Sequence, residues 1–458
     1  MNLKRKIIMP VIALCLVGSV TACSCNSGNS NTLTNNSDGK HVIEVDGKTE
    51  SYSDKTVTKT GDSDGDEADF YGENSAIFAT NKATLDLKNM TINTDGKHAN
   101  AVFSYGEGTT VNISDSNIKT SGNCSGALMT TGGGTMNATN ITAETTGNSS
   151  ATIRSDRGGG TVNVTGGTFK TSGTGSPAIY STADITVNDA QLESTASQGV
   201  VVEGKNSATL NNTTLVANNN TKNSDKSDYY QAVMIYQSMS GDASEGLSSF
   251  TMNGGSLTNA NGDIFFVNNT SSDITLSGAN IVNNDANGVF LRAAAAGWGT
   301  SGSNGGKVNL KATNQAINGN MLVDEVSTLN LYMSDNSTFN GAINPDGQKG
   351  NVYVELKNGS KWTLTGDSYV TSLTCDADSI NLNGHTLYVN GVAYKAGTAS
   401  TGNAIEINVS ESNGSAPDGN APDTKDGNPP AKPDGSSDSK NGGNSNSKSK
   451  DKPDKKGN

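Results

Sequence analysis

The stretch "TLDLKNMTINTDGKHANAVF", Thr84 to Phe103, contains three short apolar segments, TLDLK, MTI and AVF, separated by polar residues. Leu85 and Leu87 are two positions apart, so their side chains point to the same side of a β-strand. Asn, Asp and Gly follow the segments and supply the left-handed backbone that a sharp corner requires. The stretch therefore predicts three strands and three corners, which make one coil of a β-solenoid.

The same unit recurs along most of the chain. Apolar triplets begin at residues 76, 101, 127, 151, 178 and 200, which are 22 to 27 residues apart. Later copies, beginning at 233, 265, 289, 322 and 352, are up to 33 residues apart, which requires loop insertions. Helical periodicity is almost absent. We therefore expect an all-β fold, a parallel β-helix of about twelve coils.

The chain on either side of the repeats has a different composition. Residues 1–22 begin with cations, continue with an apolar run and resemble a bacterial lipoprotein signal, which implies cleavage before a lipidated Cys23. An ordinary secretory signal is the alternative. The domains we predict are then a flexible spacer at 23–40, a cap region at 41–75, the β-helix at 76–410 and a disordered Pro, Gly and Lys-rich tail at 411–458.

Charge and cysteine usage narrow the functional class. The formal net charge of −13 becomes −16 when the three cations of the signal are removed, which disfavours nucleic acid as a partner. After Cys15 and Cys23, only Cys25, Cys124 and Cys375 remain, far apart in sequence, and no disulfide framework or metal spacing is visible. We expect an extracytoplasmic monomer that is held at the cell surface through its lipid anchor on the membrane.

The repeat pattern from Ala76 to about Gly397 resembles right-handed parallel β-helix proteins of the pectin-lyase-like fold, particularly autotransporter passengers and adhesin-like surface proteins. The stretch Met333 to Thr374 is the most specific part and is similar to the last coils of adhesin-like passengers. The resemblance implies a right-handed β-helix that acts as an adhesin or carbohydrate-binding module.

Enzymes of this fold carry motifs that are mostly missing from the chain. "NTDG" at Asn93 to Gly96 matches part of a polygalacturonase site, but the paired "DD" and the "GHG" that such a site also needs do not occur. Aligning the coils puts Asp95 in a loop position that serine occupies elsewhere, so we interpret it as a corner residue. His98 and His385 also lie in polar corner contexts, where we expect structural histidines.

"RSDR", Arg154 to Arg157, resembles the arginine pair of pectate lyases, which binds uronate and abstracts a proton. The proline between the arginines and the calcium-binding aspartates of that family are missing. We expect a structural arginine with Asp156 as its partner.

A row of polar side chains suggests a ligand-binding face. The residue after each aligned apolar triplet is frequently charged, amidic or aromatic, as a row facing an extended polymer would be. In chain order this row contains Ala79, Ser104, Thr130, Arg154, Ser181, Glu203, Tyr236, Asn268, Arg292, Asp324 and Glu355. Arg157 lies beside it. Charged groups at five positions argue against burial of the row.

Loops inserted beside this row strengthen the interpretation, because long loops on a rigid scaffold are where binding concentrates. They contain Trp298, Tyr229 and Tyr230, three of the few aromatic residues outside the strands. Local packing of the loops is the alternative role for these three side chains.

The acidic stretch "DSDGDEADFYGE" is a candidate for calcium. It places Asp62, Asp64, Asp66 and Glu73 at positions one, three, five and twelve of a calcium-binding loop, although position six is Glu67 instead of glycine. A solvated acidic cap is the alternative, and no other cofactor is expected.

The sequence thus favours a surface lipoprotein that binds an extracellular polysaccharide or a host surface component and is not an enzyme. A polyuronate lyase or hydrolase that uses Arg154, Arg157, Glu203, Arg292 and Asp324 is the first alternative. A passive spacer or surface-coat protein is the second.

Overall fold

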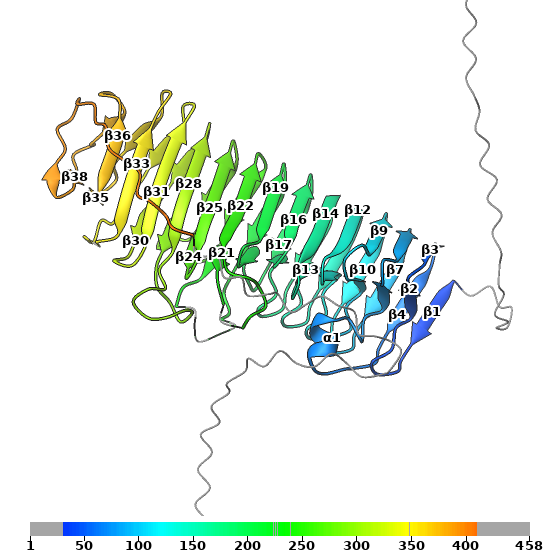
Figure 1. Cartoon of the computed structure of the whole chain (residues 1–458). Helices are drawn as coiled ribbons and strands as arrows, with labels where there is room; N and C mark the ends of the chain where they lie inside the picture. The colour runs from blue at the N-terminus through cyan, green and yellow to red at the C-terminus, as the bar shows by residue number, and fades with distance from the viewer. Residues whose placement is uncertain are drawn as a thin grey trace, which may run out of the picture. The chain divides into compact units, whose positions relative to one another are not determined.

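The computed structural model describes residues 31–409 except 223, 225, 227, 239 and 348. In this part of the chain, parallel strands of successive coils lie side by side in chain order (Figure 1). Most coils contribute one strand to each of three faces, which we number 1 to 3. The predicted all-β parallel β-helix is confirmed. The signal at 1–22 with Cys23 and the tail at 411–458 lie outside the described residues.

Face 1 is an eleven-stranded parallel sheet that contains the apolar triplets up to residue 323. Its strands are β2 (Ile43–Asp46), β5 (Ile77–Thr80), β8 (Val102–Tyr105), β11 (Leu128–Thr131), β13 (Ile153–Ser155), β15 (Ile179–Ser181), β18 (Val200–Glu203), β21 (Gln231–Tyr236), β24 (Asp263–Asn268), β27 (Leu291–Ala293) and β30 (Met321–Val323).

Face 2 contains the segments of the TLDLK type. Its strands are β3 (Thr49–Ser53), β6 (Thr84–Lys88), β9 (Thr110–Ser114), β12 (Gly134–Thr145), β14 (Gly160–Thr171), β16 (Asp184–Asn188), β19 (Ser207–Asn211), β22 (Leu247–Asn253), β25 (Ser271–Ser277), β28 (Lys307–Thr313), β31 (Thr328–Ser334), β33 (Asn351–Leu356) and β36 (Ser372–Cys375). The long strands β12 and β14 continue around the corner into face 3, so faces 2 and 3 share one 21-stranded sheet.

Face 3 is built from the third segment of each coil. Its strands are β1 (Thr32–Asn35), β4 (Thr56–Lys59), β7 (Thr91–Thr94), β10 (Asn117–Thr120), β17 (Gln191–Ser194), β20 (Thr214–Ala217), β23 (Ser256–Asn259), β26 (Asn280–Asn283), and then β29 (Ala316–Asn318), β32 (Thr338–Asn340), β34 (Lys361–Thr363) and β37 (Ile380–Asn381), which form a separate four-stranded sheet. A last small sheet contains β35 (Ser368–Val370), β38 (Leu387–Val389) and β39 (Val392–Ala393). Among the described residues, α1 (Asp66–Phe70) is the one α-helix. No helix in this part of the chain is long and apolar enough to cross a membrane.

The core lies inside the coils, where alternate strand residues stack. In β6, Leu85 and Leu87 point inward and are buried, whereas Asp86 between them is exposed. Outside, amides stack along face 2: Asn112 donates to Asp86 at 2.8 Å, and Asn137 donates to Asn112 at 2.9 Å. Each coil therefore contributes apolar contacts to the interior and side-chain hydrogen bonds to the exterior.

The corners follow the expected chemistry. Residues with positive φ come directly after several strands of face 2, for example Asn89 (φ 52°), Asp115 (φ 51°) and Asn212 (φ 47°). The "TDG" corner repeats as predicted: Thr94 of β7 is in register with Thr120 of β10, and a glycine follows two residues later in both coils. The interpretation of "NTDG" as a corner of the repeat is confirmed.

The solenoid begins before the predicted boundary at residue 76. β1 pairs with β4, and β2 pairs with β5, so the first coils lie within the predicted spacer and cap. At the other end, residues after β39 return along face 2, where Ile405 and Asn330 exchange hydrogen bonds of 3.0 and 2.8 Å.

Candidate functional site

Residues next to α1 and from the inserted loops pack on the outer side of face 1. One outward-pointing residue per strand forms a column that is mostly apolar. From β5 to β27 this column contains Phe78, Phe103, Met129, Arg154, Tyr180, Val201, Met234, Phe266 and Arg292. Two clusters form on it, one with Tyr71 near α1 and one with Tyr229 and Trp298 from the inserted loops.

The predicted binding row is wrong as a single row, because the strand register divides it. Arg154 pairs with Met129, one position before Thr130, which pairs with Ser155. Glu203 pairs with Tyr236, and each directly follows an inward-pointing residue of its strand. The coils differ in length, so counting from each triplet shifts the alignment by one residue. Glu355 is on β33 in face 2.

The structure nevertheless gathers four of the predicted aromatic residues around one hollow. Tyr229, Tyr230, Tyr236 and Trp298 line a pocket of about 100 Å³ over β15, β18 and β21. We call it the aromatic pocket. Its other lining residues are Gly175, Pro177, Tyr180, Gln198, Val201, Asn219, Thr221, Lys222, Ser224 and Met234. It therefore combines aromatic surfaces with amide groups and one cation.

Glu203 positions two of these tyrosines from beneath. Its carboxylate accepts hydrogen bonds from the hydroxyl groups of Tyr180 and of Tyr236, the latter at 2.8 Å. Burial raises the pKa of Glu203, and hydroxyl donors, including Tyr180 and Tyr236, oppose the rise. Burial and the neighbouring Glu203 raise the pKa of Tyr180 and of Tyr236 well above the usual value. The predicted ligand contact of Glu203 is thus replaced by a role in orienting the pocket wall.

The loop that carries Trp298, residues 294–306, is pinned by amides. Asn268 donates to the carbonyls of Ala294 and Asn304 at 2.9 and 2.8 Å. Asn304 in turn donates to the carbonyl of Trp298 at 2.7 Å. Asp324 accepts from the backbone N–H of Ala295 at 2.7 Å. Asn268 and Asp324, both predicted to contact ligand, hold this loop. Asn268 is fully buried, whereas a ligand contact of the partly exposed Asp324 stays a prediction.

The second loop of the pocket, residues 218–230, is tied to the first. The N–H of Gly297 donates to the carbonyl of Lys226 at 3.0 Å. The guanidinium of Arg292 lies 4.1 Å from the centre of the Tyr229 ring, and its Nε donates to Asp263 at 2.6 Å. Trp298 packs edge-on against Tyr236, with ring centres 5.1 Å apart. The inserted loops therefore converge on one site and hold its aromatic walls in place.

Arg154 and Arg157 belong to a separate ion-pair cluster beside α1. Arg154 pairs with Asp69 at 3.0 Å and with Asp156 at 2.9 Å. Arg157 pairs with Asp66 at 3.2 Å and with Asp242 at 2.8 Å, and its guanidinium lies 3.7 Å from the centre of the Phe70 ring.

The pKa shifts in this cluster follow from burial and pairing. Burial raises the pKa of Asp156, and Arg154 opposes the rise. For Asp69, burial acts upward, but Arg154 and His98 outweigh it and lower the pKa to about 2. The partner predicted for Arg154, Asp156, is confirmed, and the arginine joins α1 to the solenoid.

The four residues of the candidate calcium loop contact other groups of the protein, and two of them contact Lys97. Asp62 accepts from the N–H of Lys97 at 2.7 Å, Asp64 pairs with the Lys97 ammonium, and Asp66 pairs with Arg157. Glu73 accepts from Ser63 at 3.2 Å. In the described part of the chain these four carboxylates do not form one group of possible metal ligands. Calcium binding by this stretch stays a prediction.

The sequence analysis did not predict several residues of the aromatic pocket. Tyr180, Gln198, Asn219 and Lys222 line the aromatic pocket and were not predicted. Tyr180 is the last residue of its apolar triplet, so a shift of one position in the alignment would have found it. Comparison with protein-family models, with curated proteins and with solved structures found no match for this chain.

Proposed function

We propose that the chain is a binding protein that holds part of an extracellular polysaccharide in the aromatic pocket. The observation that carries this proposal is the convergence of five aromatic residues, which are Tyr180, Tyr229, Tyr230, Tyr236 and Trp298, on one pocket. Aromatic rings stack against the apolar faces of sugar rings, while amides exchange hydrogen bonds with hydroxyl groups. The amides of Gln198 and Asn219 are placed for the second role.

The size and charge of the pocket fit a polymer better than a free small molecule. Sites that engulf a drug-sized ligand usually measure about 300–1,000 Å³, whereas this one measures about 100 Å³. It suits one ring of a chain whose remainder lies outside. Lys222 is exposed at the rim and would favour a sugar that carries a carboxylate.

Replacing Trp298 with alanine is expected to weaken polysaccharide binding about tenfold or more, because the largest ring of the pocket is lost. Isothermal titration of the purified protein with soluble neutral and uronate polysaccharides measures this change. The ligand should also change the tryptophan fluorescence. Trp298 is partly exposed and the other tryptophan, Trp362, is fully buried, so the change should disappear in Trp298→Phe.

Tyr332→Ala is the matched control, because Tyr332 is a partly exposed aromatic residue of β31 on face 2. It should leave the affinity unchanged. Equal losses in Trp298→Ala and Tyr332→Ala would contradict the assignment of the pocket. Release of shortened or unsaturated sugar products would instead support the lyase or hydrolase alternative, and no binding at all would support a passive spacer.

We further propose that the protein is an adhesin-like lipoprotein, anchored through lipid on Cys23. The support is the cationic start, apolar run and "VTAC" sequence of residues 1–23. One lipid-modified cysteine ahead of the first described strand would place the solenoid outside the membrane surface.

Cys23→Ala is expected to move the protein from the membrane fraction to the soluble fraction of expressing bacteria, and to abolish incorporation of labelled fatty acid. Cys25→Ala, two residues further on, is the control and should keep both properties. Unchanged membrane association of Cys23→Ala would rule out this anchor.

A further inference from the structure

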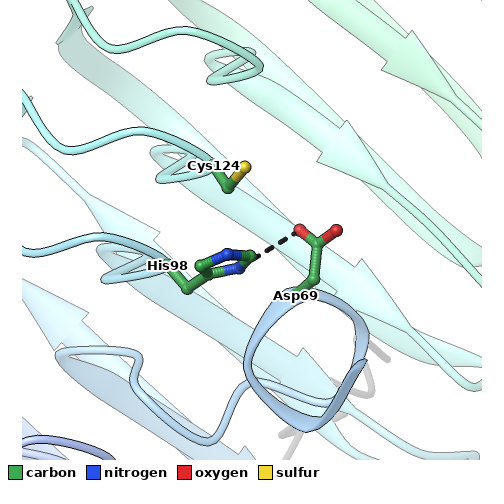
Figure 2. A group of neighbouring side chains, drawn as sticks. All are labelled: Asp69, His98 and Cys124. Carbon is green, nitrogen blue, oxygen red and sulfur yellow. Dashed lines mark ion pairs between the residues drawn. The ribbon is translucent and has the colours of Figure 1, made fainter. Parts of the chain in front are cut away.

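A histidine, a cysteine and an aspartate come together at one corner of the solenoid. Asp69 lies on α1, and His98 and Cys124 lie at the corners of two successive coils (Figure 2). One possible ligand atom from each residue lies within 4.8 Å of the other two. In the described part of the chain, this is the one group of three or more such side chains that could share a metal ion.

Among the described residues, the Nδ1 atom of His98 has no hydrogen bond of normal length, only a long contact with Asp69. His98 is only 7% exposed, and its Nδ1 atom is buried without a hydrogen bond. This atom lies 3.5 Å from Oδ1 of Asp69, which is too long for a good hydrogen bond. A buried nitrogen without a partner is costly, and a metal ion between the two side chains would remove the cost. The expectation that His98 is a satisfied structural histidine stays a prediction, because the contact of its imidazole with Asp69 is this long one.

His98 and Cys124 occupy the same position in adjacent coils. Each has a positive φ, 56° and 55°, and so does Ser149 one coil later, at 54°. The N–H of His98 donates to the carbonyl of Asn123, and the N–H of Cys124 donates to that of Asn148. Strands of adjacent coils are about 4.8 Å apart, so side chains in one corner column project in parallel at that spacing. Ser149 shows that this backbone position does not itself require histidine or cysteine.

We propose that Asp69, His98 and Cys124 bind a zinc ion, with water completing the coordination. A nitrogen, a sulfur and a carboxylate oxygen form a ligand set that suits Zn²⁺, and three protein ligands leave the fourth tetrahedral position open. Zinc–ligand bonds of about 2.0–2.3 Å put tetrahedral ligands about 3.5 Å apart. The present separations of up to 4.8 Å would therefore close by about an ångström, through side-chain rotation.

The surrounding charges are compatible with a dication. A deprotonated Cys124 and Asp69 would together neutralise Zn²⁺. Arg154 also contacts Asp69 Oδ1, at 3.0 Å, but its charge is balanced by Asp156 at 2.9 Å. Lys97, the residue before His98, is paired with Asp64. Bound zinc would fasten α1 to two coils of the solenoid, a role independent of the aromatic pocket.

Cobalt(II) provides the first test, because it replaces zinc and gives a thiolate-to-metal absorption band. The purified protein should bind one equivalent of Co²⁺ with such a band, and Zn²⁺ should displace it. Cys124→Ser should abolish the band without unfolding the chain, since Ser149 occupies the same corner position in the next coil. His98→Asn, which keeps a residue tolerant of positive φ, should weaken Zn²⁺ binding about 100-fold or more, since even loss of a partner of a metal ligand costs about 10–100-fold.

Cys375→Ser is the matched control, because Cys375 is a buried free thiol far along the solenoid in β36. It should keep the full band. The chain also has Cys15, Cys23 and Cys25 outside the described residues, so the comparison between variants decides the result. A band of equal strength in Cys124→Ser, or the lack of one-to-one binding in the unmodified protein, would overturn the proposal. Thermal unfolding of each variant without metal confirms that the fold is kept.

Discussion

Replacing Arg154 with methionine is expected to lower the free energy of unfolding by about 3–5 kcal/mol. The guanidinium of Arg154 is paired with Asp156 at 2.9 Å and with Asp69 at 3.0 Å. Asp156 is only 3% exposed, so loss of Arg154 leaves a buried carboxylate without its counter-ion. Unfolding in urea, followed by circular dichroism, measures the change.

The loss should also depend on pH. Burial raises the pKa of Asp156, and Arg154 opposes that rise, so removing Arg154 should raise the pKa further above the value of about 3.9 for an unfolded aspartate. A carboxyl with a raised pKa in the folded state is tolerated while it is protonated, and it destabilises the fold as pH rises toward that pKa. The variant should therefore be closer to the unmodified protein at about pH 5 than at about pH 8.

A double variant separates the ion pair from simple packing. Arg154→Met combined with Asp156→Asn removes both charges and should recover most of the lost stability, with little dependence on pH. Equal stability of the single and double variants at both pH values would show that the lost packing of Arg154, and not the unpaired carboxylate, causes the effect.

The fold could be predicted because each coil repeats a physical pattern. Leu85 and Leu87 alternate with polar residues, and Asn89 supplies the positive φ of the following corner. The first coils were missed because their strands are less apolar. In β3, Glu50 and Tyr52 take the inward-facing positions and remain partly exposed, so the sequence there has no apolar alternation.

The site could be predicted only in part, because the register between neighbouring strands cannot be read from the sequence. The loops with Tyr229, Tyr230 and Trp298 stand out as insertions, and they converge as a binding site would. Which strand residue faces them depends on the pairing of strands, and one residue of slip exchanges the inward and outward sides. Tyr180 was missed for this reason, and Arg154 was placed in the wrong row.

The corner cluster has a sequence signal that spacing rules for metals do not capture. His98 and Cys124 are one coil apart, and Asp69 comes from a helix inserted earlier in the chain. Such ligands approach each other only when coils stack, so a search for closely spaced ligands overlooks them. Aligning the corners would have shown a histidine and a cysteine where the next coil has Ser149.

The second large expected effect on stability comes from replacing a corner glycine. Gly122→Ala should lower the free energy of unfolding by about 3 kcal/mol or more, because a methyl group there has no space. A Cβ atom on Gly122 would lie 1.9 Å from the carbonyl oxygen of Gly96 in the preceding coil. A Cβ atom on Gly147, in the next coil, would lie equally close to the carbonyl oxygen of Gly122. Hydrogen bonds between the coils hold the backbone next to these glycines, from the N–H of Ser121 to Thr94 at 2.9 Å and from the N–H of Thr146 to Thr120 at 3.0 Å, so the coils would have to separate locally.

Gly384→Ala tests whether close approach, and not conformational freedom, is the reason for these glycines. Gly384 has a φ of 84° and no atom within 4 Å of its added Cβ, so alanine there should cost only the roughly 1–2 kcal/mol of a left-handed residue. At Gly122 the φ is not in the left-handed region, so the steric conflict acts alone. If urea unfolding showed Gly122→Ala to be no less stable than Gly384→Ala, the corner would be able to shift, and the stacked carbonyls would not limit which residues the repeat accepts.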